Sequence, residues 1–302
     1  MTTYTQIDSN KRRSFLLLTT FLIVVILVGW VFSQALNNPL ILYIAVAISF
    51  TQALIGYYAG DKITLAISGA KQIKKENNPE LYNIVENLTI ATGLPMPKIY
   101  IINDTAPNAF ATGRNPHTAS IAVTRGILEK LDKNEIEGVI AHELSHVKNY
   151  DIRFMTLTVI LVGFIVLVSD LFLRWTFWGR GGNREEGGGQ TQLIFLVIGI
   201  VLAILAPLIA MLIKLAISRK REYLADADGA LMTRYPEGLA GALEKIARDT
   251  EPLEVANKAT AHLYIANPLK EHKGKNARGW FANLFETHPP IEERIKKLKQ
   301  MA

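Results

Sequence analysis

The residues best suited to chemistry in this sequence lie in one short run, His142-Glu-Leu-Ser-His146. In an α-helix, His142 and His146 lie one turn apart on the same face, so both imidazoles can bind one zinc ion. Glu143 lies between them and is close enough to take a proton from an attacking water molecule. The run therefore predicts a hydrolytic zinc site with its own general base.

The helix that carries this run is predicted to begin at Asp132, and Glu135, three residues further on, is its capping-box partner. Two short β-favouring runs precede it, at residues 98–102 and 119–124, and the segment between them contains residues 108–113. By analogy, we expect a small mixed sheet beside the zinc helix, with an edge strand that can pair with an extended peptide. The apolar positions of the helix are Ile136, Val139, Ile140 and Leu144.

A catalytic zinc site needs a third protein ligand, and a chain without cysteine must supply it from histidine or a carboxylate. Glu222 and Asp226 are four residues apart, hence on one helix face. One of them can bind zinc while the other accepts the second N–H of a ligating imidazole. A solvated acidic face that balances Arg219 and Arg221 explains the same spacing, so the spacing alone leaves both interpretations open.

The apolar residues of the chain are concentrated in four blocks. A bilayer core of roughly 30 Å needs about 20 helical residues, so each block is long enough to span it. The first block is interpreted as a retained anchor, because no small-residue cleavage site closes it. The blocks cover residues 15–32, 40–57, 155–173 and 193–217.

The net charge of +6 is distributed beside these blocks and does not form one face for nucleic acid. This bias predicts that both termini and the polar segments face the cytoplasm, and it excludes nucleic acid as a partner. Arg174, Arg180 and Arg184 lie in the opposite loop and weaken the bias for the second pair of spans. The basic residues on the predicted cytoplasmic side are Lys11, Arg12, Arg13, Lys71, Lys74, Lys75, Arg219, Lys220 and Arg221.

The predicted fold class is an α-helical membrane protein with four transmembrane helices and a mostly α, α+β catalytic part on the cytoplasmic side. Residues 1–59 form the first transmembrane hairpin, and residues 60–154 form a catalytic segment with the zinc helix. Residues 155–217 form the second hairpin, which contains a glycine-rich loop at 179–189, and residues 218–302 supply the third ligand.

The distances along the chain favour Glu222 as a neighbour of the histidine pair. His146 lies eight residues before Phe154, where the third predicted span begins, and Glu222 lies five residues after Ile217, where the fourth ends. Antiparallel spans joined by a short hairpin bring those two points together at one membrane face. Eight helical residues rise about 12 Å, so we expect the site just above the lipid headgroups.

Four runs together resemble the M48 family of integral-membrane zinc metallopeptidases, and the resemblance covers essentially the whole chain. It implies a zincin-like (gluzincin) catalytic domain that holds one Zn²⁺ per chain. The implied ligands are His142, His146 and Glu222, the implied general base is Glu143, and Asp226 is the implied partner of a ligating imidazole. The runs are residues 142–146, 221–226, 108–113 and 288–294.

The resemblance also implies how the site handles substrate. His288 is the implied oxyanion-stabilising catalytic group, and Arg294 supports it or closes the fold. A structural turn before the helix at residues 291–299 is the alternative for His288, which stands next to two prolines. The implied substrate-binding residues of the edge strand are Asn108, Ala109, Phe110 and Ala111, and the histidines expected to lie on the surface or in loops are His117, His262 and His272.

The implied activity is endoproteolysis of misfolded or damaged membrane proteins, as stress-response quality control in the bacterial inner membrane. The implied partners are such substrates and the lipid bilayer. A protease that processes one defined precursor would have the same ligands. A non-enzymatic membrane adaptor or transporter would need neither the zinc run nor a third ligand, and the spans carry too few polar residues for the obvious ion path of a transporter.

Overall fold

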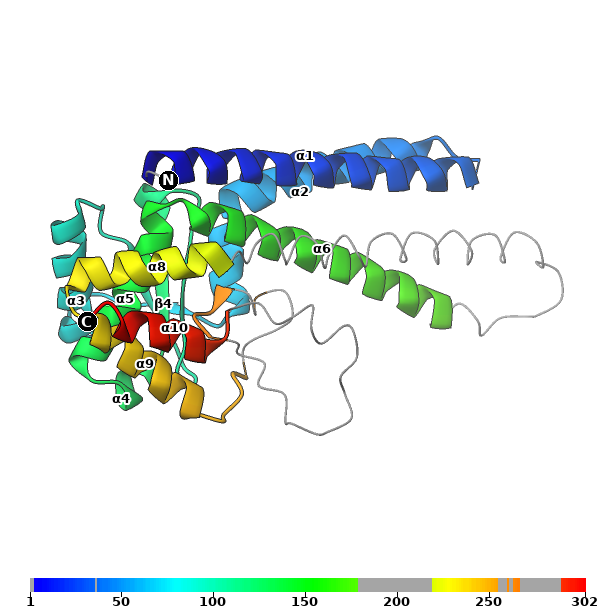
Figure 1. Ribbon diagram of the computed structural model, residues 1–302. Helices are drawn as coiled ribbons and strands as arrows, with labels where there is room; N and C mark the ends of the chain where they lie inside the picture. Colours follow the sequence, from blue (N-terminus) through cyan, green and yellow to red (C-terminus); the bar gives the residue numbers. More distant parts are fainter. Residues whose placement is uncertain (1–2, 36, 179–218, 255–259, 261–262, 267–288) are drawn as a thin grey trace.

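The computed structural model describes residues 3–35, 37–178, 219–254, 260, 263–266 and 289–302. Two long helices, α1 (Thr3–Ala35) and α2 (Leu40–Ile67), lie side by side and project from a globular part that contains the sheet and the shorter helices (Figure 1). Helix α6 (Asp151–Trp178) extends from the same side of the globular part (Figure 1). The predicted fourth span, at residues 193–217, and the glycine-rich loop lie outside the described residues.

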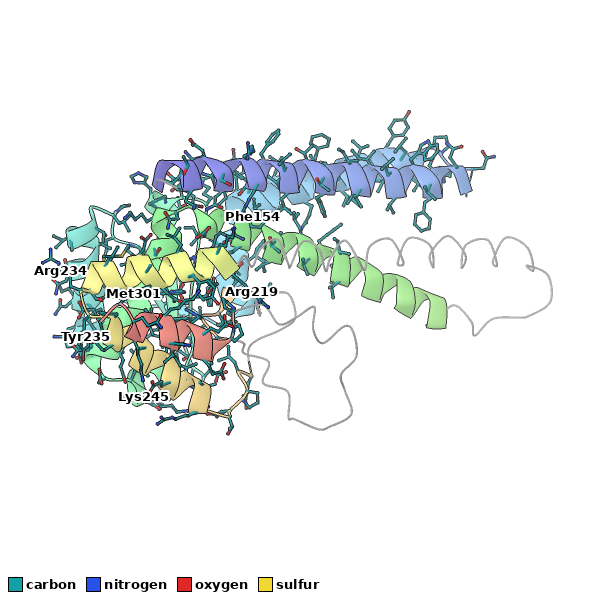
Figure 2. All side chains as sticks on the ribbon, viewed as in Figure 1. Phe154, Arg219, Arg234, Tyr235, Lys245 and Met301 are labelled. Atoms are coloured by element: carbon teal, nitrogen blue, oxygen red, sulfur yellow. The ribbon has the colours of Figure 1, made fainter. Side chains whose placement is uncertain are left out.

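The first two predicted membrane spans are confirmed as helices of spanning length. The segments Thr5–Gln34 and Leu40–Ile67 are long and apolar enough to cross a bilayer. Their side chains project outward along the whole hairpin (Figure 2), as expected for helices whose solvent is lipid. Large apolar side chains exposed on the hairpin include Phe15, Leu16, Ile23, Leu27, Trp30, Leu40, Tyr43, Ile44, Ile48, Phe50 and Leu54.

The zinc helix does not continue straight into the third apolar block. Helix α5 (Lys133–Lys148) and α6 meet at an angle of 84°, and Tyr150 between them has a left-handed φ of 60°. The expectation of a continuous 12 Å rise from His146 to Phe154 is therefore wrong. Within the described residues, a third candidate span exists only if α5 and the following helix are counted as one bent pair. Phe154 lies where α6 leaves the globular part (Figure 2).

The predicted mixed sheet is confirmed, with four strands in the order β1-β2-β4-β3. Strand β4 pairs in parallel with β2 and antiparallel with β3, so β3 is an edge strand. The strands are β1 (Lys71–Gln72), β2 (Lys98–Ile102), β3 (Ala109–Thr112) and β4 (Ser120–Thr124).

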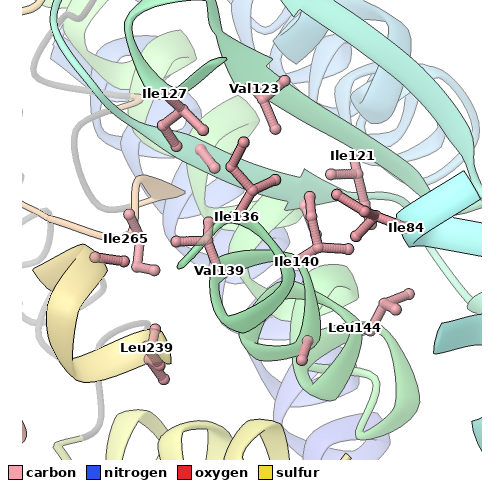
Figure 3. Close-up of a cluster of buried hydrophobic side chains, with 14 of the residues drawn as sticks. Ile84, Ile121, Val123, Ile127, Ile136, Val139, Ile140, Leu144, Leu239 and Ile265 are labelled. Carbon is pink, nitrogen blue, oxygen red and sulfur yellow. The ribbon is translucent and has the colours of Figure 1, made fainter. Parts of the chain in front are cut away.

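Helix α5 is the centre of the core. Its apolar positions face β4 on one side, and the C-terminal helices cover the opposite side (Figure 3). All four residues of the predicted apolar stripe are buried. The other α-helices of the globular part among the described residues are α3 (Pro79–Thr92), α4 (Arg125–Lys130), α8 (Arg219–Thr233), α9 (Pro236–Arg248) and α10 (Ile291–Lys299). The core side chains around α5 include Ile84, Ile121, Val123, Ile127, Leu239 and Ile265.

Candidate metal centre

The start of α5 is set by the predicted capping box. The Asp132 side chain accepts a hydrogen bond from the Glu135 backbone N–H at 3.0 Å, and the Glu135 carboxylate accepts one from the Asp132 N–H at 2.8 Å. Lys245 of α9 also pairs with Glu135. The capped N-terminus fixes where the helix begins, so His142, two turns later, enters the buried part of the molecule.

The three predicted ligands come together. The Nε2 atoms of His142 and His146 lie 3.3 Å apart. The Glu222 carboxylate, on α8, lies 3.8 Å from Nε2 of His142 and 3.6 Å from Nε2 of His146. One donor atom from each residue falls within 4.8 Å of the other two, and all three residues are buried. The interpretation of residues 219–226 as a solvated acidic face is therefore wrong.

Each imidazole lies close to a second carboxylate. Nδ1 of His142 lies 3.0 Å from Oδ1 of Asp226, and Nδ1 of His146 lies 3.1 Å from Oδ2 of Asp151. A proton on each Nδ1 leaves both Nε2 lone pairs directed at the same space. Two lone pairs and a carboxylate converge favourably only on a cation, because they repel each other otherwise.

The donor set fits zinc. Two imidazole nitrogens and one carboxylate form a recognised catalytic zinc ligand set, which keeps a fourth position open. Ligands about 2.0–2.1 Å from a tetrahedral ion lie roughly 3.4 Å from each other, close to the three separations given above. The buried carboxyl groups of Glu143, Asp151, Glu222 and Asp226 outnumber the buried guanidinium groups of Arg221 and Arg294, so the surroundings favour a bound cation.

The buried Arg294 joins the C-terminal helix to this centre. Its Nε and Nη2 donate to the two oxygens of Asp226 at 2.9 Å and 2.7 Å, the bidentate geometry that guanidinium and carboxylate favour. Its Nη1 donates to the Ile265 carbonyl at 2.8 Å. Arg294 therefore closes the fold by fixing α10 to α8, which is one of its two predicted roles. His288, which it was also expected to support, lies outside the described residues.

Glu143 is buried beside the three candidate ligands and faces the edge strand. Burial raises the pKa of its carboxyl group to about 7, and the Glu222 carboxylate acts in the same direction. The imidazole of His146 and a hydrogen bond from the backbone N–H of Ala111 lower the pKa and partly offset that effect. A carboxyl group poised near neutral pH can both accept and release a proton, as a general base and acid must.

The two imidazoles have opposite pKa shifts. Burial lowers the pKa of His142 and outweighs the attraction of Asp226, which keeps this ring neutral, as a metal ligand must be. Burial also lowers the pKa of His146, but the hydrogen bond with Asp151 and the charge of Glu222 raise it to about 9. The shift at His146 reports the strong negative field into which a metal cation would bind.

Edge strand β3 points part of its backbone at the site. The Thr124 N–H donates to the Asn108 carbonyl at 2.9 Å, so alternate residues Ala109 and Ala111 direct their backbone groups away from β4. The Ala109 carbonyl accepts from the Ile265 N–H at 3.0 Å. Of the predicted substrate-binding residues, Ala111 thus lies next to Glu143, while Ala109 also bonds the chain's own segment 263–266.

The other two predicted substrate-binding residues hold this segment in place. The Asn108 side chain donates to the Ala266 carbonyl at 3.1 Å and accepts from the Ala266 N–H at 3.4 Å. The Phe110 ring packs edge-on against Tyr264, with ring centroids 5.1 Å apart. Contact of β3 with substrate remains a prediction.

Comparison with known proteins agrees with this geometry. The model of a family described as "Peptidase family M48" matches residues 75–302, which is most of the chain. The chain belongs to peptidase family M48. It is therefore a metallopeptidase, and its two apolar helices make it a membrane metallopeptidase.

Similar M48 proteins cover almost all of this chain. It is 46% identical over 298 residues to a protein named Protease HtpX homolog from Tropheryma whipplei (strain Twist), covering 99% of this chain and 98% of that one. It is 44% identical over 301 residues to the Protease HtpX homolog of Dictyoglomus thermophilum, covering 99% and 95%. The predicted resemblance to the M48 family is confirmed.

A solved structure is also similar in fold. The crystal structure of S. mikatae Ste24p aligns with a TM-score of 0.51 at 19% identity, covering 98% of this chain and 67% of that one. At this identity the likeness concerns the fold alone. It extends over the hairpin as well as the globular part, because almost the whole chain is aligned.

Asp151 is the site residue of this M48 chain that sequence reasoning missed. It lies five positions after His146, a spacing that does not place two residues on one side of a continuous helix. The break at Tyr150 turns the first residue of α6 back toward the imidazole. The Asn10 amide of α1 donates to Asp151 at 2.7 Å and to the Asn149 carbonyl at 2.8 Å, so the N-terminal hairpin helps to position the site. No local sequence pattern predicts that Asn10 contacts the site.

Two glycines allow the helices to approach α5 closely enough to form the site. A Cβ at Gly229 of α8 would lie 3.1 Å from the His142 backbone nitrogen, and a Cβ at Gly138 of α5 would lie 2.5 Å from the Leu239 nitrogen of α9. Real Cβ atoms rarely approach backbone so closely, so larger residues would push both helices away. The first contact sets how far Glu222 lies from His142, because both are on the helices that cross there.

The remaining histidines stay outside the centre as far as the structure describes them. His117 is exposed in the 3₁₀ turn at Pro116–Thr118, as predicted. His262 and His272 lie outside the described residues.

Proposed function

We propose that this membrane metallopeptidase is a zinc-dependent endopeptidase with His142, His146 and Glu222 as ligands. The observation that carries the proposal is the convergence of two Nε2 atoms and a carboxylate within 4.8 Å, beside the buried Glu143. Asp226 and Asp151 hold the two imidazoles in the tautomer that ligation requires.

A zinc ion held by these residues supplies Lewis-acid chemistry, lowering the pKa of water and polarising a carbonyl. Glu143 accepts the proton of the attacking water and delivers it to the leaving amine. The pKa of about 7 given by burial suits both transfers. The outward backbone of β3 offers the Ala111 carbonyl to an extended peptide, which holds the scissile bond beside Glu143.

For the oxyanion-stabilising group we propose His288, which precedes Pro289 and the helix that carries Arg294. A donor aimed at the developing oxyanion commonly contributes 10²–10³-fold to the rate. The variant His288→Ala should therefore keep its zinc and lose kcat by about that factor, measured on a fluorogenic peptide. A loss of zinc, or a rate within threefold of the wild type, would assign His288 to the structural turn instead.

The role of Glu143 gives the sharpest test of the enzyme mechanism. The Glu143→Gln variant should bind zinc normally, because Gln keeps the size of the side chain and all three ligands remain. It should lose cleavage of casein, because the amide cannot accept the proton. Zinc content by atomic absorption and casein cleavage with and without 1,10-phenanthroline measure both properties. Proteolysis retained in zinc-loaded Glu143→Gln protein would refute the role, and His142→Ala, the matched control, should lose zinc and activity together.

We further propose four membrane crossings in the bacterial inner membrane, with both termini and the site in the cytoplasm. The projection of α1, α2 and α6 from one side of the globular part supports a site close to the membrane surface (Figure 1). Cysteines introduced singly in residues 179–189 of this cysteine-free chain should react with an impermeant maleimide only from the periplasmic side. Labelling from the cytoplasmic side alone would refute four crossings.

A site at the membrane surface can reach the loops of neighbouring membrane proteins, which supports a role in quality control of misfolded or damaged ones. Such a protease should cleave several unrelated destabilised membrane proteins at similar rates and spare their folded forms. A strong preference for one precursor, folded or not, would instead identify a processing protease.

A further inference from the structure

A second cavity lies away from the metal centre, between α2, the first turns of α6 and the loop that follows β3. It has a volume of about 200 Å³, enough for a phosphate group with its esters. Its lining combines small, aromatic and charged residues. The charged and aromatic lining residues include Tyr57, Tyr58, Lys62, Lys98, Arg114 and Arg153, with Asp61 as the acidic member.

The cavity is strongly basic. Four lysine and arginine side chains line it against one carboxyl group. Within the part of the chain that the structure describes, Lys62, Lys98, Arg114 and Arg153 have no carboxylate within 4.0 Å. The Arg153 side chain is fixed by a 2.7 Å hydrogen bond from its Nε to the Arg114 carbonyl. That bond leaves the two terminal nitrogens of the guanidinium for another acceptor, and an anion is the acceptor that guanidinium groups prefer.

Two tyrosine rings complete the wall. The Cζ atom of Arg114 lies 5.1 Å from the centre of the Tyr58 ring and 5.7 Å from that of Tyr57, and the Cζ of Arg153 lies 5.9 Å from the Tyr57 ring. These cation–π contacts hold both guanidinium groups beside the membrane hairpin. Tyrosine is the residue type enriched where a spanning helix passes from hydrocarbon to headgroups.

The position of the cavity along the helices also marks the membrane boundary. Tyr57 ends the apolar run of α2, and Arg153 precedes the apolar run of α6. Gly56 and Gly60 of α2 allow α6 to approach closely there, since a Cβ at Gly60 would lie 3.0 Å from the Thr156 methyl group. The two helices therefore meet at the level where both become polar, and the basic cavity opens beside this crossing.

We infer that this cavity binds the phosphate of an anionic phospholipid headgroup. Basic pockets between membrane helices at the cytoplasmic surface are suited to such headgroups, because the guanidinium groups bind phosphate oxygens while the acyl chains remain in the bilayer. Free phosphate shares this chemistry. The tyrosines and the position at the end of two apolar helices favour the lipid, whose chains gain contact with α2 and α6.

The test uses the full chain, purified in a neutral detergent and titrated with phosphatidylglycerol or phosphatidylcholine of the same acyl chains. Native mass spectrometry counts the lipid molecules that each protein retains. The wild type should retain one phosphatidylglycerol at concentrations where phosphatidylcholine is not retained. The variant Arg114→Gln/Arg153→Gln should bind it at least tenfold more weakly. Because Arg153 also contributes a structural hydrogen bond, Lys62→Gln/Lys98→Gln, on two exposed side chains, provides a second variant with the same expected direction.

The matched control is Arg125→Gln/Arg248→Gln, which removes the same charge from exposed positions on α4 and α9 and should bind like the wild type. Equal zinc content shows that each variant is folded. Unchanged phosphatidylglycerol binding in both cavity variants, or equal binding of phosphatidylcholine, would overturn the inference. Displacement of the lipid by inorganic phosphate at matched concentration would assign the cavity to a free anion and overturn it as well.

Discussion

Replacing Asp151 with asparagine should weaken zinc binding without touching a candidate ligand. The carboxylate serves two sides of the site at once: Oδ2 lies 3.1 Å from Nδ1 of His146, and Oδ1 accepts from Asn10 at 2.7 Å and lies 3.4 Å from Arg221 Nη1. An asparagine has the same shape but only one acceptor oxygen. Its NH₂ group must therefore face one of these donors.

The size of the effect follows from that mismatch. If the amide oxygen stays with Asn10, the NH₂ group faces His146 and favours the tautomer with its proton on Nε2, where zinc would bind. Leaving a buried donor unsatisfied costs about 1–3 kcal/mol, and every 1.4 kcal/mol is tenfold in affinity. We expect a 10- to 100-fold loss of zinc affinity, the usual range for losing the partner of a ligating histidine.

Competition with a chromogenic zinc chelator in detergent measures this affinity directly. The matched control is Asp228→Asn. Asp228 lies in the same region and accepts hydrogen bonds from Ser145 and Asn149 at 3.2 Å, but within the described part of the chain it has no hydrogen bond to either imidazole. Thermal unfolding of the zinc-free proteins separates an effect on the site from an effect on the fold. A zinc affinity of Asp151→Asn within twofold of the wild type would refute the reasoning, as would an equal loss in the control.

Two further changes test how the C-terminal helices hold the site. Arg294→Met should lower the unfolding free energy by about 3–5 kcal/mol, because it leaves the buried Asp226 carboxylate without its bidentate partner. It should also reduce zinc affinity. Thermal melts of this variant and of Arg125→Met, a control at an exposed position, measure the difference in stability. A melting temperature for Arg294→Met equal to that of the control would show that the ion pair contributes nothing. Gly138→Ala should lower the unfolding free energy by about 1–3 kcal/mol, because the new methyl group would lie 2.5 Å from the α9 backbone. Lys133→Ala, on the exposed first turn of α5, should leave the unfolding free energy nearly unchanged. Equal melting temperatures for these two variants would contradict the close packing of α5 and α9.

The sequence alone was sufficient for the features that depend on local rules. Helical periodicity places His142 and His146 on one face, and the capping box at Asp132 sets where their helix begins. The lengths of the first two apolar blocks predict α1 and α2, because a bilayer requires spans of that length. Short β-favouring runs predict β2 and β4, whereas the edge strand β3 is implied by the family resemblance and β1 is not predicted.

Tertiary structure decided everything that depends on distance between segments. The four-residue spacing of Glu222 and Asp226 did not decide whether Glu222 is a zinc ligand or a solvated acidic residue. The packing of α8 on α5 at Gly229 brings Glu222 to the histidines. Asp151 reaches His146 only because the chain breaks at Tyr150, and no periodicity predicts a single left-handed residue.

The same reason applies to the partners from distant parts of the chain. Asn10 and Arg294 meet the two halves of the site from opposite ends of the sequence, and the Arg153 side chain of α6 reaches the Arg114 carbonyl in the loop after β3. Local sequence rules determine which chemistry the residues can perform. Long-range packing determines which of those residues are close enough to perform it together.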